Sequence, residues 1–396
     1  MKSIITDKKA IEAVFARGAV VEAYPSKDAV IEAMSSGKRL RIYIGFDPTA
    51  TALHLGHARN IMVLEELRQL GHEVIVLFGD FTAMIGDPDK AATRKQLTRE
   101  EVQRNVADWV RQITPLIGFT DAENPAKLMY NSAWLSELSL GDVVELASKF
   151  TVQQFIERDL FQKRIREGNP IHLHEFMYPL MQGYDSVVMD VDAELCGTDQ
   201  IFNALAGRTL MRKMKDKEKL VIALNLLANP ATGQLMSKSN GTGIFIDQAP
   251  NDLFGAIMAV PDPMIEPLYM HLTRLPLEEK EAVMARGPRQ AKAAVARDIV
   301  KRFHGEAAAD AAVAAFEKTF AKGGIPDDIM EISLAGAPLV DALVTAGVIE
   351  SKSEWRRLVK ENAVRLADDT KVTDPAFSPE KGAVLKIGKR RFVKIG

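Results

Sequence analysis

The feature that most constrains the fold is a strand–helix–strand pattern between residues 40 and 78. Residues 40–46 (LRIYIGF) alternate in polarity and are rich in β-forming side chains, which predicts a strand. Apolar residues then recur at helical spacing from about Gly56 to Leu70, before Gly71, and residues 73–78 (EVIVLF) predict a second, fully buried strand. The short connections predict a βαβ unit, which implies a parallel sheet covered by helices on both faces.

Residues 1–228 are therefore predicted to form one α/β domain with a doubly wound, Rossmann-like parallel sheet. Its further strands are expected at 126–130, 187–191 and 220–224. Ligands of such sheets bind beyond the carboxyl ends of the strands. Residues 45–49 (GFDPT) and 86–88 (GDP) follow predicted strands, and we expect a site there.

Two smaller domains are predicted after this one. Residues 229–325 begin with a polar loop and continue as Ala-rich amphipathic segments, which indicates an α-helical domain. Residues 323–326 (GGIP) predict a linker. Residues 333–396 are predicted to form a small α+β domain. Its helices are expected at about 338–346 and 351–362, and its strands around Arg365, at 383–387 and at 391–395.

Composition excludes several classes of protein. Hydrophobic residues make up 47% and charged residues 26%, which is ordinary for a globular chain and wrong for a disordered one. No apolar run approaches the roughly 18 residues that span a bilayer, and the first residues lack the apolar core of a signal peptide. The single cysteine, Cys196, excludes an internal disulfide and a multi-cysteine zinc site. We expect a cytoplasmic protein that does not associate with membranes.

Charge is unevenly distributed along the chain. Residues 351–396 carry a net charge of +6, although the whole chain carries −2. A basic tail on an acidic body indicates a polyanionic partner such as RNA, because Lys and Arg bind phosphate backbones. A solvated surface that is merely basic would have the same composition, and charge alone does not choose between the two.

Two short motifs far apart in the chain indicate nucleotide chemistry. His54-Leu55-Gly56-His57 lies at a predicted helix start, where free N–H groups favour phosphate. Met236-Ser237-Lys238-Ser239 lies in a polar loop, where a lysine can reach a polyphosphate. Each motif alone also fits an ordinary helix start or surface loop. Together, in this order and fold context, they resemble the two signatures of class I aminoacyl-tRNA synthetases.

Wider motifs resemble one branch of that family, the bacterial-type tyrosyl-tRNA synthetases. The resemblance covers nearly the whole chain and includes a C-terminal segment similar to the S4 RNA-binding fold. The motifs that carry it are residues 43–50 (YIGFDPTA), the two described above, Gly86-Asp87-Pro88, the Tyr178…Gln182…Asp185 row and Gly197-Thr198-Asp199-Gln200. The spacing of the row places its side chains on one helix face. Polar groups on such a face require a partner, which a polar ligand would provide.

The resemblance implies L-tyrosine as a substrate. Asp185 would accept the phenol proton while Tyr43 donates to the same oxygen, so that phenylalanine would leave both groups unpaired; enzymes of this type are the usual illustration of such discrimination. The α-ammonium group would be held by Asp87, Tyr178 and Gln182, and the carboxylate by Gln200. Tyr43 could instead be a half-buried sheet residue. Asn131 and Trp134 could flank the tyrosine or pack in the core.

The resemblance also implies ATP, with Mg²⁺ on its phosphates and no dedicated metal site in the protein. Among the residues implied to be catalytic, Thr49 and His54 would contact the γ-phosphate, His57 the nucleotide, and Lys238 the departing pyrophosphate. The other implied nucleotide contacts are Gly45, Asp47, Gly56, Gly197 and Asp199. No protein nucleophile is required, because the tyrosine carboxylate attacks the α-phosphorus and catalysis is positioning and charge stabilisation.

The sequence departs from the family pattern at two positions. Leu235 stands where relatives often have a lysine, which places more of the pyrophosphate stabilisation on Lys238 or on lysines elsewhere, such as Lys90 or Lys95. Cys196 precedes Gly197 where relatives commonly have a second glycine. His172 and His174 resemble a metal-binding pair, but no further Cys or His cluster joins them, and we expect no bound metal.

The tail and the assembly complete the expectations. Lys352, Arg356, Arg357 and Lys360 fall at helical spacing and could follow an RNA backbone. By resemblance the RNA is tRNA(Tyr), contacted at its long variable arm, and the protein is a homodimer. Three alternatives stay open: a tryptophanyl-tRNA synthetase, a synthetase-derived RNA-binding protein without activity, and a free-standing nucleotidyltransferase.

Overall fold

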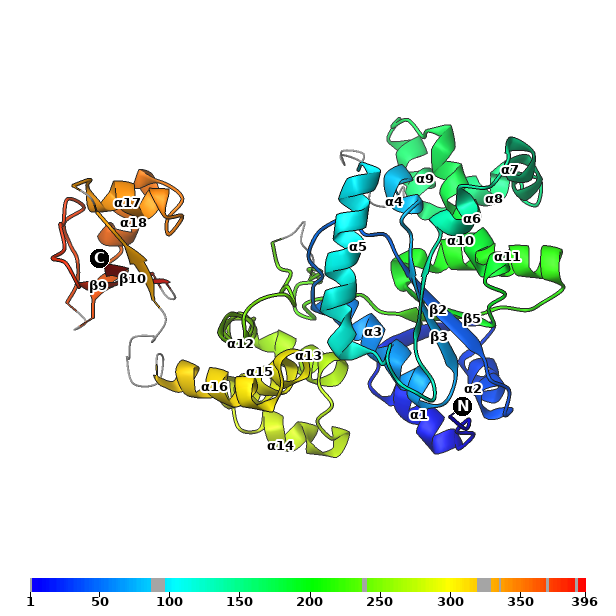
Figure 1. Cartoon of the computed structure of the whole chain (residues 1–396), viewed down its shortest axis with the longest axis horizontal. Helices are drawn as coiled ribbons and strands as arrows, with labels where there is room; N and C mark the ends of the chain where they lie inside the picture. The colour runs from blue at the N-terminus through cyan, green and yellow to red at the C-terminus, as the bar shows by residue number, and fades with distance from the viewer. Residues whose placement is uncertain are drawn as a thin grey trace. The chain divides into compact units, whose positions relative to one another are not determined.

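The computed structural model describes residues 2–86, 97–236, 241–318, 329–334, 336–367, 370–388 and 391–396. The chain divides into two compact units, Met1–Glu306 and Ala307–Gly396 (Figure 1). Among the described residues, no helix has the length and apolar character needed to cross a membrane. The further division predicted at residues 228 and 229 stays a prediction, and the linker predicted at 323–326 lies outside the described residues.

The first unit contains a six-stranded sheet in the order β1-β6-β5-β2-β3-β4. The five parallel strands are β2 (Arg41–Phe46), β3 (Glu73–Phe78), β4 (Lys127–Tyr130), β5 (Ala193–Gly197) and β6 (Leu220–Leu224). The strands predicted at 40–46, 73–78, 126–130 and 220–224 are confirmed. The sequence reading missed β1 (Val20–Tyr24), an edge strand that runs antiparallel to β6.

The prediction of a strand at residues 187–191 is wrong. Helix α10 (Met177–Val188) extends into this segment, and Asp190 leaves the helical region with a φ of +48° before β5 begins. Met189 and Val191 are buried with Tyr43 and two residues of β3. A short apolar run fits a buried helix end as well as a buried strand, and only packing distinguishes them.

The chain order of the strands reverses between β2 and β5, which lie side by side with Tyr43 opposite Glu194. Such a switch point opens a crevice beyond the carboxyl ends of the two strands, where ligands bind in open α/β sheets. Helix α3 (Leu55–Gln69) contacts β2 and β3, whereas α10 packs closely on α11 (Ile201–Lys215), which contacts β5 and β6 (Figure 1). The crevice is therefore bordered by helices from both faces of the sheet.

Helices predominate after β6, as predicted. They are α12 (Pro250–Met258), α13 (Ile265–Leu272), α14 (Lys280–Met284), α15 (Pro288–His304) and α16 (Glu306–Phe316). An ion pair joins this region to α3, because Arg274, after α13, lies 2.5 Å from Glu66 of α3. Burial lowers the pKa of Arg274 to about 10, although the charge of Glu66 opposes this. These helices thus share a partly desolvated electrostatic contact with α3, the helix that follows β2.

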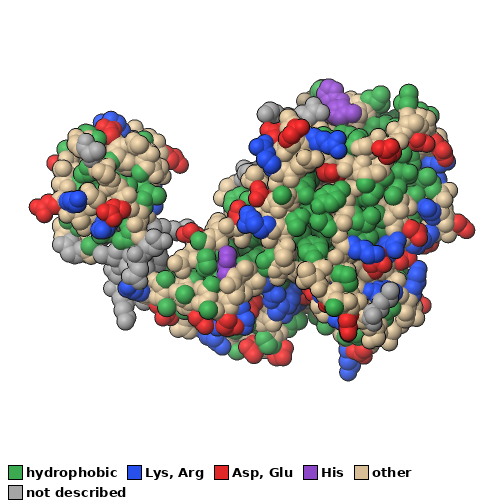
Figure 2. Space-filling view, viewed as in Figure 1, with side chains coloured by type: hydrophobic (Ala, Val, Ile, Leu, Met, Phe, Trp, Pro, Cys, Tyr) green, Lys and Arg blue, Asp and Glu red, His purple; other side chains and the backbone are tan. Residues whose placement is uncertain are grey.

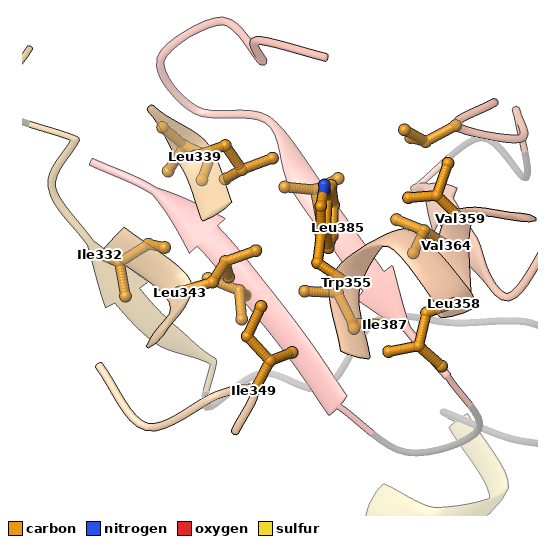
Figure 3. Packing of buried hydrophobic residues seen from close by; sticks show 13 residues of the cluster. Ile332, Leu339, Leu343, Ile349, Trp355, Leu358, Val359, Val364, Leu385 and Ile387 are labelled. Carbon is orange, nitrogen blue, oxygen red and sulfur yellow. The ribbon is translucent and has the colours of Figure 1, made fainter. Parts of the chain in front are cut away.

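The second unit has a mixed four-stranded sheet in the order β7-β10-β9-β8. Its elements are β7 (Met330–Ile332), α17 (Leu339–Thr345), α18 (Lys352–Lys360), β8 (Val364–Leu366), β9 (Val384–Ile387) and β10 (Arg391–Ile395). The predicted helices and three strands are confirmed, and β7 is an addition. Side chains from both helices and the sheet converge around the fully buried Trp355 (Figure 3). The Trp355 indole donates to the Pro375 carbonyl at 2.8 Å, which satisfies its polar atom.

Candidate active site

The loop that follows β2 is held by one face of helix α5 (Arg99–Ile113). Three buried α5 side chains donate to its carbonyl oxygens: Asn105 to Pro48 at 2.8 Å, Trp109 to Ala50 at 2.5 Å and Gln112 to Thr51 at 2.9 Å. Gln112 also accepts from the Leu53 N–H at 2.8 Å. Because these donors recur at i, i+4 and i+7, a single helix face fixes the path of the chain toward His54. The sequence reading missed all three residues.

The His54–His57 motif forms the start of α3, as predicted. His54 is the N-cap, and its Nδ1 accepts from the Gly56 N–H at 3.1 Å, while the His54 N–H donates to His57 Nδ1 at 3.3 Å. The two rings lie 3.9 Å apart between centroids, and His57 lies 5.6 Å from Trp109. A Cβ on Gly56 would lie 2.9 Å from His54 Cε1, so a larger residue would displace this ring.

The segment after the Met236–Ser239 motif lies against the start of α3. Phe245 pairs with His54 in an antiparallel bridge, and the Leu55 N–H donates to the Ile244 carbonyl at 3.0 Å. On the other side of the loop, the Met236 N–H donates to the Leu227 carbonyl at 2.8 Å. Residues 244 and 245, which follow the second motif in the chain, are therefore neighbours of the first motif. Lys238 itself lies outside the described residues.

Leu235 belongs to the ordered strand-like segment that enters this loop. It pairs with Ala228, and its carbonyl accepts from the Thr242 hydroxyl at 2.7 Å. About a third of its surface is exposed. The backbone at this position is thus held by hydrogen bonding on both sides of the motif.

Asp47 and Tyr178 connect the nucleotide-side loop to helix α10. The Tyr178 hydroxyl donates to Asp47 Oδ2 at 2.7 Å, and the Thr82 hydroxyl donates to Asp47 Oδ1 at 2.7 Å. A Cβ at Gly79 would lie 2.1 Å from Asp47 Oδ1, so only glycine fits beside this carboxylate. One residue predicted to contact ATP and one predicted to contact tyrosine therefore share a hydrogen bond.

Asp185 is a buried carboxylate with two neutral donors. Its Oδ1 accepts from the Trp134 indole at 2.7 Å and its Oδ2 from the Asn131 amide at 3.3 Å. Burial raises the pKa of Asp185 well above its ordinary value, the two donors oppose this, and the charges of Glu194 and Asp47 raise it further. Asn131 and Trp134 thus contact Asp185 directly. A hydroxyl donor at this carboxylate would relieve the cost of its burial.

Tyr43 is completely buried, and its hydroxyl lies 3.0 Å from the Ser186 hydroxyl. Burial raises the pKa of Tyr43 well above its ordinary value, and the negative charges of Glu194 and Asp185 raise it further. The phenol therefore keeps its proton at neutral pH and is available as a donor. Its packing against Met189 and Trp134, which bonds Asp185, places it beside the Asp185 carboxylate.

A buried ion pair lies under this pocket, and sequence reasoning missed it. Lys219, just before β6, forms an ion pair with Glu194 of β5, and both side chains are almost completely buried. Gln182 donates from its amide nitrogen to the other Glu194 oxygen at 2.8 Å. This orientation leaves the Gln182 carbonyl oxygen to accept from an ammonium group. A charged residue in an otherwise apolar strand, as in residues 193–196 (AELC), was the available signal.

The loop after β5 contains the residues predicted to contact the nucleotide and the tyrosine carboxylate. A Cβ at Gly197 would lie 2.4 Å from Asp199 Oδ1, so the carboxylate approaches bare backbone. The Gln200 amide donates to Asp199 at 3.2 Å and accepts from Asn203 at 2.9 Å. Cys196 packs between Ala204 and Val221, and burial raises the pKa of its thiol well above the ordinary value, so it fills space.

The remaining predicted residues fall into three groups. Asp87, like Lys238, lies outside the described residues. Thr49 lies in the loop held by α5, where its N–H donates to the Asp47 carbonyl at 2.8 Å, and Gly45 lies near the end of β2. His172 and His174 are exposed with rings 5.8 Å apart, and the described residues contain no group of three or more metal-binding side chains.

Comparisons with known proteins agree with this architecture. Residues 35–321 match the family model described as tRNA synthetases class I (W and Y). The chain is 43% identical over 385 residues to the Vibrio parahaemolyticus protein named tyrosine–tRNA ligase 2, covering 95% of this chain and 96% of the relative. It is 42% identical over 399 residues to the Carboxydothermus hydrogenoformans protein named tyrosine–tRNA ligase, covering 95% of each chain.

Solved structures share the fold at lower identity. A C-terminally truncated Aspergillus nidulans mitochondrial tyrosyl-tRNA synthetase matches with a TM-score of 0.66 at 23% identity, over 81% of this chain and 95% of that one. Plasmodium falciparum tryptophanyl-tRNA synthetase matches with a TM-score of 0.57 at 15% identity, over 79% of this chain and 92% of that one. The fold is thus common to proteins named for either amino acid, and the side chains of the pocket must distinguish the substrates.

Proposed function

The chain belongs to the class I tRNA synthetases of the tryptophan and tyrosine branch, and we propose that it acts as a tyrosine–tRNA ligase. It activates L-tyrosine with ATP to form tyrosyl-adenylate and pyrophosphate, and then transfers tyrosine to the 3′ end of tRNA(Tyr). The observation that carries the choice of amino acid is the buried pair of Tyr43 and Asp185. Together they offer a hydroxyl donor and a carboxylate acceptor to one ligand atom, as a phenol requires and an indole does not.

The amino acid is held by α10 and the strands below it. The phenol lies between Tyr43 and Asp185, and its α-ammonium group lies near Tyr178 and Gln182, with Asp87 as a further partner. The Gln182 carbonyl oxygen is suited to this role, since Glu194 holds the amide nitrogen. Gln200 holds the carboxylate at the carboxyl end of β5. This arrangement directs the carboxylate toward the crevice between β2 and β5.

Activation is an in-line attack of a tyrosine carboxylate oxygen on the α-phosphorus of ATP, which breaks the bond to pyrophosphate. Thr49, His54 and His57 bind phosphates at the start of α3, where the helix end favours negative charge. Lys238 adds a cation for the leaving pyrophosphate. Gly45, Gly56 and Gly197 allow the nucleotide to approach the backbone, and Asp199 binds the ribose. The protein positions the two substrates and stabilises the charge on the leaving pyrophosphate, and it forms no covalent intermediate with them.

Mg²⁺ is proposed to enter with ATP, neutralising phosphate charge. The phosphate side of the site offers imidazole and hydroxyl groups and the positive end of α3, which suit phosphate oxygens. Asp47 is already engaged by Tyr178 and Thr82. This donor set fits a metal ligated mainly by phosphate and water rather than by a protein cage.

A homodimer is part of the proposal. Helices α7 (Leu140–Ala147) and α8 (Val152–Ile156) expose large apolar side chains on the first unit, with Leu140 80% exposed and Val144 60%. Hydrophobic side chains also gather on the visible face of this unit in Figure 2. Contiguous exposed apolar surface marks an interaction site. Sedimentation equilibrium tests the proposal, and Leu140→Glu with Val144→Glu should yield monomers.

The second unit is proposed to be an S4-like domain that binds the variable arm of tRNA(Tyr). Lys352, Arg356, Arg357 and Lys360 are all exposed on α18. Lys352 pairs with Asp341 and Arg357 with Glu361, whereas Arg356 and Lys360 have no acidic partner among the described residues. Arg356→Glu with Lys360→Glu should weaken binding of labelled tRNA(Tyr) at least about 10-fold, since each phosphate contact adds to affinity. Undiminished affinity, also after truncation at residue 325, would contradict the role of the tail.

The same proposal includes three functional domains, at 1–228, 229–325 and 333–396, and a cytoplasmic location, where aminoacyl-tRNA is consumed. Tyrosine-dependent ATP–pyrophosphate exchange is the primary test. Exchange with tyrosine is expected, with little exchange for tryptophan or phenylalanine. Exchange with tryptophan but not tyrosine would favour the other branch, and no exchange with either would favour an RNA-binding protein without activity.

A further inference from the structure

A buried lysine lies under the candidate tyrosine pocket. Lys219 has no exposed surface, and its ammonium group bonds the Glu194 carboxylate and the Ser186 hydroxyl, the latter at 2.9 Å. The ammonium nitrogen also lies 5.8 Å from the centroid of the Tyr43 ring. A buried lysine requires a charge partner, and Glu194 provides it. The bond to Ser186 goes beyond this pairing and connects the lysine to the pocket.

The chemistry of the groups gives this connection a direction. An ammonium group can only donate, whereas a serine hydroxyl has one proton and two lone pairs. Ser186 has no exposed surface, and in the described part of the chain its hydroxyl contacts only Lys219 and the Tyr43 oxygen, at 3.0 Å. Lys219 occupies one lone pair of Ser186. The Ser186 proton then has a single acceptor, the Tyr43 oxygen, because a buried donor without an acceptor is costly.

This direction determines what Tyr43 presents to a ligand. Its oxygen accepts from Ser186, so its own proton points away from Ser186. In the free protein Glu194 is a hydrogen-bond partner of the Tyr43 hydroxyl, and it also accepts from Lys219 and Gln182. A phenol oxygen entering beside Asp185 is the competing acceptor. The opposite direction, with Tyr43 donating to Ser186, would present only lone pairs to that oxygen.

We infer that Lys219 and Ser186 are positioning residues that make Tyr43 a hydrogen-bond donor toward the substrate phenol, and so help to select tyrosine over phenylalanine. The inference rests on the proposed function and deepens it. Neither residue touches the substrate. Both act through the Tyr43 hydroxyl, and their effect therefore depends on the substrate having a phenol oxygen.

The alternative is that the Lys219–Glu194 ion pair only fills and stabilises the core. Buried ion pairs often contribute little beyond a well-packed apolar replacement. The two roles differ in one measurable respect. A structural defect lowers activity with tyrosine and phenylalanine alike, because both use the same ATP site and the same backbone. A defect in the donor relay lowers activity with tyrosine only.

The experiment measures ATP–pyrophosphate exchange with tyrosine and with phenylalanine in the full-length protein. Two variants are compared with wild type: Ser186→Ala, and Lys219→Met combined with Glu194→Gln, which removes both charges and leaves none buried alone. In each, kcat/KM for tyrosine should fall about 10-fold, the value of roughly one buried hydrogen bond. The change should lie in KM for tyrosine. The kcat/KM for phenylalanine and the KM for ATP should stay within about 2-fold.

Lys217→Met is the matched control. Lys217 lies two positions away in the sequence and pairs with Asp190 and Asp192 rather than with Glu194, so its loss should leave the ratio of tyrosine to phenylalanine activation unchanged. Circular dichroism verifies folding, and Ser186→Cys, a weak donor of similar size, replaces Ser186→Ala if the latter does not fold. An equal fall with both amino acids, or no fall with tyrosine, would overturn the inference. If wild type shows no tyrosine-dependent exchange, the proposed function fails instead.

Discussion

The amino-acid end and the nucleotide end of the candidate site are built by different means. At the amino-acid end, Tyr43, Asp185 and Ser186 are buried, and side chains on the sheet and α10 hold one another. At the nucleotide end, side chains of α5 hold backbone carbonyls between Pro48 and Thr51, and His54 and His57 remain only partly buried. One end fixes functional side chains directly, and the other fixes the main chain from which they project.

The difference follows from what each end must recognise. A phenol offers one oxygen, and selectivity for it requires polar groups that are costly to leave unpaired, which means burial. Burial has a price, visible in the raised pKa values of Tyr43 and Asp185. Phosphates carry charge on many oxygens, and the positive end of a helix dipole together with imidazole groups can attract them without deep burial. The buried amino-acid end therefore selects the substrate, and the nucleotide end, whose main chain is held by α5, positions the phosphates.

Loss of the Asp185 carboxylate should give the largest difference between the two ends, because it should impair the use of tyrosine and not that of ATP. Asp185→Ala removes the acceptor for the phenol and leaves the Trp134 and Asn131 donors without a partner. We expect kcat/KM for tyrosine in ATP–pyrophosphate exchange to fall about 100-fold or more, with KM for ATP nearly unchanged, since charged hydrogen bonds are the strong ones. Asp190→Asn, at the exposed end of α10, is the control. Near-normal exchange in Asp185→Ala would refute the pocket.

One tryptophan lies at each end of the site, and replacing each should raise the KM of a different substrate. Trp109→Phe keeps a ring beside His57 but loses the donor to the Ala50 carbonyl, and we expect KM for ATP to rise about 10-fold. Trp134→Phe loses the donor to Asp185, and we expect KM for tyrosine to rise by a similar factor. Steady-state kinetics with each substrate varied in turn measures both. If both variants changed the same KM, the two ends would not be independent.

Acid should lower the free energy of unfolding of the sheet that carries both ends of the site. Its effect on the choice between tyrosine and phenylalanine should be the smallest of those predicted. His72, fully buried at the entrance to β3, accepts from the Leu40 N–H through Nδ1. Burial, aided by the charge of Arg39, lowers the His72 pKa from 6.5 to about 4. Because the unfolded chain binds this proton more readily, stability is complete above pH 6.5 and is lost as the pH falls toward 4.

For His72 the full loss amounts to about 3 kcal/mol. Urea unfolding between pH 7 and pH 4 measures it, and His72→Gln, which can still accept from Leu40, should flatten the dependence. His271, whose pKa burial also lowers to about 4, should account for part of the remaining slope. At pH values at which the protein is folded, the His72 substitution should not change the ratio of tyrosine to phenylalanine activation. A changed ratio would connect the start of β3 to the selection of the amino acid.

Local patterns in the sequence determined much of this protein. Alternation in residues 40–46, the helical repeat that follows and the apolar run at 73–78 specified the βαβ unit, because these periods depend on near neighbours in the chain. The His54–His57 motif was placed at a helix start for the same reason. The Tyr178, Gln182 and Asp185 row needed only the period of one helix.

Only the tertiary structure decided which polar groups meet. Residues 187–191 have a strand-like composition, but packing beneath the sheet makes them a helix end. Asn105, Trp109 and Gln112 have the spacing of an ordinary amphipathic helix, and their partners are carbonyls of a loop distant in sequence. Lys219 and Glu194 become neighbours of Tyr43 because β5 lies between β2 and β6. Strand order is a global property of the chain, and no local period encodes it.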